Sequence, residues 1–175
     1  MGHSFGGLVT SSYLAFSPHP KIRGLVLTSP LYGIALPVPL WRHFLGMLLS
    51  VLAGDHCESS NVNPAFLTHD KELLKAYSKD PLIFHKISAR LYRELKTMVD
   101  RKNEIAGKLI LPVLMLQAGE DHIVSKDRAV EFYDQTRSLD KELEVYDGFY
   151  HEILNEVGRE KVFARLSGWL TKHTL

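Results

Sequence analysis

The chain has 175 residues and a mass of 19.8 kDa, with 45% hydrophobic and 23% charged residues and a formal net charge of +1. This length and composition fit one globular domain with room for an insertion, and they exclude a disordered, collagen-like or disulfide-scaffold chain. The near-neutral charge leaves no basic footprint for nucleic acid. The single cysteine, Cys57, cannot form an internal disulfide, which fits a reducing compartment, and we expect it to be part-buried.

The sequence predicts a helix near its start and three strands further along the chain. Helical periodicity runs from about Gly7 to Phe16 and ends at Ser17-Pro18-His19-Pro20. Two short apolar runs bounded by turn residues, Ile22–Thr28 and Leu109–Ala118, are typical of strands buried on both faces of a sheet. A third run, Glu142–Tyr146, alternates in polarity and predicts an edge strand.

Helices separate and follow these strands. Residues 125–136 place apolar side chains on one face, and a wide apolar stripe near the C-terminus comprises Val162, Phe163, Leu166, Trp169 and Leu170. Alternation of strands and helices predicts an α/β fold with a parallel sheet flanked by helices.

The stretch between the first two long strands breaks this alternation. It contains no convincing strand but three helical patterns, Pro39–Ala53, Lys71–Tyr77 with Asp70 as N-cap, and 88–103. We expect residues 1–30 and 108–175 to form the core and residues 31–107 to form a helical cap over the strand ends. Helices that pad one side of the sheet are the alternative.

The most apolar part of this stretch, Ile34–Ala53, is interrupted by Pro37, Pro39, Arg42 and His43. A helix that spans a bilayer needs about 20 consecutive apolar residues, so the segment is expected to touch lipid or cover an apolar pocket. Its stripe at helical spacing is more typical of core packing than of a ligand wall; the stripe comprises Trp41, Phe44, Leu48 and Leu52. Because no signal peptide precedes the first motif, we expect a cytoplasmic protein. Contact of the cap with a membrane is an open alternative.

The chain begins with the pattern G-x-S-x-G, in Gly2-His3-Ser4-Phe5-Gly6. A serine on a sharp strand-to-helix turn has strained backbone angles, and flanking glycines remove the steric conflict. The turn places the hydroxyl at a helix N-terminus, where the backbone amide of Phe5 can donate to an oxyanion. The pattern also fits a glycine-rich helix start, but the helical periodicity directly after it favours a nucleophile elbow.

A serine nucleophile needs a base, and the base needs an acid to orient it. Asp121 comes directly after the strand that ends in Gln117-Ala118, and His151 lies in the loop after the last strand. The order Ser4, Asp121, His151 is that of an α/β-hydrolase triad.

Other residues compete for two of these roles. Glu120 and Asp127 are alternative acids, although strand alternation points Glu120 the other way and Asp127 lies inside the next helix. His122 and His3 are alternative bases. No histidine pair has metal-ligand spacing and no phosphate-binding glycine motif is present, so we expect neither a metal nor a cofactor.

The segments GHSFGG, QAGEDHIVS and GFYHEILNE together resemble the monoacylglycerol lipase and bacterial lysophospholipase branch of the α/β-hydrolase superfamily. SNVNPAFLTHD and AYSKDPL resemble part of that family's cap. The resemblance implies Ser4 as nucleophile, Asp121 as acid, His151 as base and the Phe5 amide as one oxyanion donor. It also implies a small-molecule lipid ester substrate, a monoacylglycerol or a lysophospholipid, cleaved through an acyl-enzyme.

The chain departs from this family at its start. Family members have several strands before the nucleophile and an upstream His-Gly loop that gives a second oxyanion donor, whereas Met1 stands one residue before the motif here. We therefore expect a C-terminal portion of the fold whose first strand, Ile22–Thr28, has a bare edge open to self-association. The alternatives are a thioesterase, a proline-type aminopeptidase, or an inactive fragment that associates through this edge.

Overall fold

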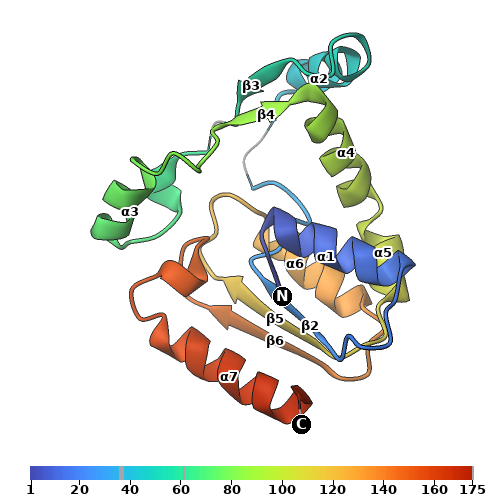
Figure 1. Cartoon of the computed structure of the whole chain (residues 1–175), viewed down its shortest axis with the longest axis vertical. Coiled ribbons are helices and arrows are strands. Elements are labelled where there is room, and N and C mark those ends of the chain that lie inside the picture. The colour runs from blue at the N-terminus through green and yellow to red at the C-terminus, as the bar shows by residue number, and fades with distance from the viewer. Residues whose placement is uncertain (36–37, 61, 175) are drawn as a thin grey trace.

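The computed structural model describes residues 1–35, 38–60 and 62–174 and contains a four-stranded parallel sheet. The strands lie in the order β1 (Gly2–His3), β2 (Leu25–Thr28), β5 (Val113–Ala118) and β6 (Lys141–Tyr146), and each neighbouring pair is parallel. Helices cover both faces (Figure 1). The expected α/β class, a parallel sheet flanked by helices with an edge strand at β6, is confirmed.

Two separate apolar clusters, one on each face of the sheet, hold the helices in place. Helices α1 (Phe5–Phe16), α5 (Lys102–Lys108) and α6 (Lys126–Gln135) share one cluster with Leu27 and Met115. Helix α7 (Glu160–Thr174) shares the other with Val26 and Leu114. Successive residues of β2 and β5 thus point to opposite faces, which explains why both strands read as continuous apolar runs.

The two central strands are shorter than their apolar runs. Strand β5 begins at Val113 and not at Leu109, because Pro112 has no amide proton to donate to a ladder. Its carbonyl instead accepts the amide of Leu25 at 2.8 Å, which sets the first residue of β2.

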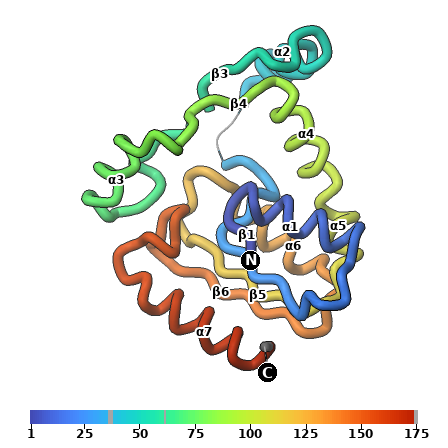
Figure 2. The backbone as a smooth tube through the Cα atoms, viewed as in Figure 1, coloured from blue at the N-terminus to red at the C-terminus, as the bar shows by residue number. Residues whose placement is uncertain are grey.

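Most of the segment between β2 and α5 forms a layer apart from the sheet (Figure 2), whereas Tyr32, just after β2, packs in the core. It contains α2 (Leu40–Leu52), α3 (Lys71–Tyr77) and α4 (Ala89–Asp100), with the short 3-10 turn η1 (Pro64–Phe66). Asp70 caps α3 as predicted, accepting the amides two and three residues on. The expectation of no strand was wrong: β3 (Cys57–Ser59) pairs antiparallel with β4 (Lys86–Ser88), and three residues are too few to show a periodicity.

The apolar stripe of α2 faces solvent, so the expectation of core packing was wrong. Trp41 is 61% exposed and Phe44 is 71% exposed. The opposite face packs on α4, where His43 Nδ1 and the hydroxyl of Tyr92 lie 2.8 Å apart. Residues 36 and 37 of the apolar stretch lie outside the described residues. Cys57, expected to be part-buried, is exposed in the short strand β3.

No helix in the described ranges is both long and apolar enough to cross a membrane. Helix α2 has 13 residues and exposes apolar side chains on one face.

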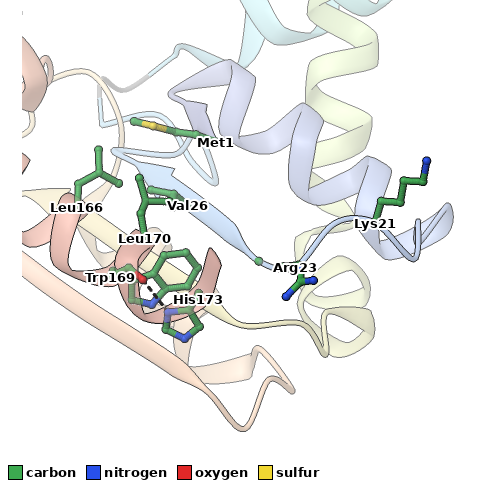
Figure 3. Close-up of a pocket in the computed structure, with 9 residues that line it drawn as sticks. Met1, Lys21, Arg23, Val26, Leu166, Trp169, Leu170 and His173 are labelled. Carbon is green, nitrogen blue, oxygen red and sulfur yellow. Dashed lines mark hydrogen bonds between the residues drawn. The ribbon is translucent and has the colours of Figure 1, made fainter. Parts of the chain in front are cut away.

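Strand β2 has a partly bare edge. Residues 2–3 form β1 and pair with Leu27 and Thr28, so the last two residues of a serine-delivering strand are present, contrary to the expectation that this strand is missing. Within the described ranges, Leu25 and Val26 pair only with β5. A cavity of about 320 Å³ lies beside them, walled by Trp169 and Leu170 of α7 (Figure 3).

Candidate active site

Ser4 lies on the sharp turn between β1 and α1, with φ 50° and ψ −122°. A positive φ is strained for a residue with a side chain. Backbone hydrogen bonds hold it there: the Ser4 amide donates to the Thr28 carbonyl at 3.0 Å, and its carbonyl accepts the amides of Gly7 at 2.9 Å and Leu31 at 3.0 Å. The turn is therefore anchored to β2, to the segment after it and to α1.

Close packing explains two glycines around this turn. A Cβ at Gly2 would lie 2.3 Å from Thr10 Oγ1 and 2.5 Å from the Gly6 carbonyl oxygen, and one at Gly7 would lie 2.9 Å from Pro30 Cβ. Gly6 is different, because a Cβ there meets nothing within 4 Å. The expected steric role of the flanking glycines thus applies to Gly2 and not to Gly6.

Asp121 and His151 form one hydrogen-bonded chain with Ser4. His151 Nδ1 lies 2.8 Å from Asp121 Oδ2, and His151 Nε2 lies 2.9 Å from Ser4 Oγ. Asp121 Oδ1 accepts the amides of Ile123 and Val124, each at 2.9 Å. Because an ionised carboxylate only accepts, these partners assign the proton of His151 to Nδ1 and leave Nε2 free to accept from Ser4.

Burial keeps water away from the acid and the base. The side chain of Asp121 is fully buried and that of His151 is 4% exposed. The two residues come from loops after neighbouring parallel strands, β5 and β6, whose carboxyl ends meet at one edge of the sheet. Phe5, the first residue of α1, carries one of the amides that a helix N-terminus leaves without an intrahelical partner.

Three of the four competing residues lie outside the hydrogen-bonded chain and are exposed. Glu120 and Asp127 are exposed, and neither is the carboxylate on His151. His122 is exposed, and its ring packs against Phe66 at 4.8 Å and Tyr150 at 5.2 Å between centroids.

His3, an alternative base in the sequence analysis, lies beside the triad and contacts Glu152, a contact that the sequence analysis did not predict. Its ring centroid is 4.9 Å from that of His151, and its Nε2 lies 3.2 Å from Glu152 Oε1. Burial raises the pKa of Glu152, but interactions with His3, together with a hydrogen bond from Asn155, contribute to a net pKa below the ordinary value of 4.5. In the sequence, the only indication of this contact was that Glu152 directly follows His151.

Metal-ligating side chains do not gather in the described part of the chain: no three His, Cys, Asp or Glu residues there could hold an ion. The polar groups at the site are those of a proton-transfer chain ending on a hydroxyl.

A strained serine between a strand and a helix, on a parallel sheet whose later strands lead to an aspartate and a histidine, defines an α/β-hydrolase. The family model described as serine aminopeptidase, S33, matches residues 1–158. The chain belongs to this family.

Individual relatives include a phospholipase and several monoglyceride lipases. Phospholipase YtpA of Bacillus subtilis is 33% identical over 93% of this chain and 63% of its own length. Human monoglyceride lipase is 26% identical over 99% of this chain and 58% of its own. The crystal structure of Paleococcus ferrophilus monoacylglycerol lipase superposes with a TM-score of 0.92 at 27% identity, covering 98% of this chain and 67% of that one. The chain thus spans less than two thirds of both curated relatives.

Proposed function

We propose that the chain carries the catalytic machinery of a serine ester hydrolase that cleaves lipid esters. The observation that carries the proposal is the continuous hydrogen-bonded chain from Asp121 through His151 to Ser4, on a strained turn. A hydroxyl at 2.9 Å from a free imidazole nitrogen is within reach for proton transfer.

In the proposed reaction, Ser4 Oγ attacks the ester carbonyl while His151 Nε2 takes its proton. Asp121 stabilises the imidazolium, and the Phe5 amide donates to the oxyanion. His151 then returns the proton to the leaving alcohol as the acyl-enzyme forms. Water, activated by the same nitrogen, releases the fatty acid and restores Ser4.

The proposed substrate is a monoacylglycerol or a lysophospholipid. The exposed apolar face of α2 is suited to an acyl chain or to peripheral contact with a membrane surface. Relatives named as phospholipase and monoglyceride lipase support the same class. In this proposal residues 1–30 and 108–175 are the hydrolase core and residues 31–107 are the cap, except that α5 packs on the sheet through Ile105 and Ala106 and is counted with the core.

The test compares substrate classes on one purified protein. Release of product is measured with monoolein, lysophosphatidylcholine, an acyl thioester and a proline anilide, for the parent and for Ser4→Ala. The proposal expects turnover of one or both lipid esters that Ser4→Ala abolishes. Faster cleavage of the anilide or of the thioester contradicts the substrate class, and turnover that survives Ser4→Ala contradicts the nucleophile.

A second candidate function is association through the sheet edge. The bare edge at Leu25 and Val26, next to an apolar cavity, favours pairing with another strand. Light scattering after size-exclusion chromatography tests it, because association predicts species above 19.8 kDa and a stable monomer contradicts it.

A further inference from the structure

A buried carboxylate outside the proposed triad lies five residues after His151. The side chain of Glu156 is 1% exposed, and both of its oxygens accept hydrogen bonds. Oε1 accepts the amides of His69 at 2.9 Å and Val157 at 2.8 Å, while Oε2 accepts the amide of Tyr150 at 3.1 Å and lies 3.0 Å from His69 Nδ1. An ionised carboxylate can be buried only with partners of this kind.

These partners come from two distant parts of the chain. His69 belongs to the segment between η1 and α3, whereas Tyr150 directly precedes His151. Glu156 therefore connects residues 67–69 to the loop that carries the proposed base.

The same two segments are also joined on the other side of His151. The Glu152 amide donates to the Leu67 carbonyl at 2.8 Å, and the Thr68 hydroxyl donates to the Asn155 carbonyl at 2.9 Å. Thr68 Oγ1 is also 3.1 Å from Glu156 Oε1. The residues before and after His151 are thus both fixed to one short segment, which limits how far the imidazole can move.

Ring contacts extend the connection toward the acid. His69 packs on Tyr150 with 3.8 Å between ring centroids, and Tyr150 contacts His122, the residue after Asp121, at 5.2 Å. Burial raises the pKa of Glu156, but the amides of His69, Val157 and Tyr150 outweigh it and bring the pKa below 4.5. The carboxylate is ionised at neutral pH.

We propose that Glu156 is a positioning residue, which fastens segment 67–69 to the loop around His151 and so holds the imidazole on Ser4 and Asp121. The inference deepens the proposed function and rests on it. Glu156 touches neither Ser4 nor Asp121 in this arrangement, so it acts through His151. A movement of segment 67–69 would therefore alter the reactivity of Ser4 even though Ser4, Asp121 and His151 themselves are not substituted.

The test is the rate of labelling of Ser4 by a fluorophosphonate in the parent, Glu156→Gln and Glu160→Gln. The glutamine is nearly isosteric, but its NH₂ group would face at least one of the groups that donate to Glu156, which are the amides of His69, Val157 and Tyr150 and the His69 ring. Because a displacement of about 1 Å can cost about 10²-fold in rate, we expect labelling to slow by at least about tenfold. Glu160, an exposed carboxylate in the first turn of α7, is the matched control and should label at the parent rate.

A second readout reports the position of His151 directly. The proton on His151 Nδ1, shared with buried Asp121, should give a downfield proton resonance in the parent that Glu156→Gln weakens or abolishes. A merely stabilising role for Glu156 would leave both this resonance and the labelling rate unchanged in the folded variant. If Glu156→Gln does not fold, His69→Ala is measured by the same two readouts; it keeps the backbone amide on Glu156 but removes the Nδ1 contact and the ring packing on Tyr150.

The outcomes separate the two proposals. A parent that labels, with Glu156→Gln slower by about tenfold or more and a weakened resonance, supports both. A parent that labels, with a smaller change in Glu156→Gln, overturns the positioning role and leaves the proposed function intact. A folded parent that does not label overturns the proposed function, and the resonance alone then decides whether Glu156 positions His151.

Discussion

Replacing Asp121 by asparagine should disable the proposed base without removing any atom that packs. Oδ1 of Asp121 accepts two amides, from Ile123 and Val124, each at 2.9 Å. The asparagine keeps these bonds only if its oxygen occupies that position, which turns its NH₂ group toward His151 Nδ1. Two donors cannot face each other, so the imidazole proton moves to Nε2, the nitrogen that must accept from Ser4.

The wrong tautomer in a Ser-His-Asp triad costs about 10⁴-fold in rate, which corresponds to about 5 kcal/mol of transition-state stabilisation. The assay is hydrolysis of a soluble short-chain ester, or labelling of Ser4, at neutral pH. The free energy of unfolding should change little by comparison, since the volume is preserved. Asp121→Asn with activity within about tenfold of the parent would refute the assignment of the acid.

Three further predictions test other parts of the structure. Gly2→Ala should lower the free energy of unfolding in urea by about 1–3 kcal/mol, because its Cβ would lie 2.5 Å from the Gly6 carbonyl oxygen. Gly6→Ala should raise the free energy of unfolding by about 0.5–1 kcal/mol, because its Cβ would meet open space. The reverse order of the two variants would contradict the packing argument. The double variant Trp41→Ser/Phe44→Ser removes two exposed apolar side chains of α2. It should bind phosphatidylcholine vesicles at least about tenfold more weakly in a sedimentation assay while its hydrolysis of a soluble ester is unchanged; equal binding would exclude α2 as the lipid contact. Because the folded-state pKa of Glu156 lies below 4.5, its contribution to stability is present above pH 4.5 and is lost as the pH falls through the folded-state pKa. The difference in unfolding free energy between the parent and Glu156→Gln should therefore shrink in acid, and a constant difference would contradict the ionised state.

The sheet was predictable because its signal is local and strong. Strand β5 is buried by helices on both faces, and the sequence shows this directly because five of its six residues, all but Gln117, are apolar. Helix α3 was equally clear, because Asp70 caps it and the cap has a one-residue signature. Strands β3 and β4 were missed, since a strand of three residues is too short to show a periodicity.

The surface of α2 shows what a pattern leaves open. A stripe at helical spacing says that a helix has an apolar face, but not what covers that face. Here the other face packs on α4, and Trp41 and Phe44 point to solvent. The tertiary contacts that decide between these two orientations are not encoded in the spacing.

The candidate site divides in the same way. Ser4, Asp121 and His151 could be found from chain order and from their places at strand ends, and the structure brings them together. Glu156 could not be found, because its partners at residues 68 and 69 are distant in sequence and four of its five contacts involve backbone amides or a hydroxyl that no motif records.

The most direct test of the account is covalent labelling of the 175-residue chain with a fluorophosphonate, read by intact mass beside Ser4→Ala. The account predicts one adduct on the parent and none on Ser4→Ala, because only a serine activated by His151 reacts. A folded parent without an adduct, or an adduct that persists in Ser4→Ala, would contradict the central claim that Ser4 is the nucleophile.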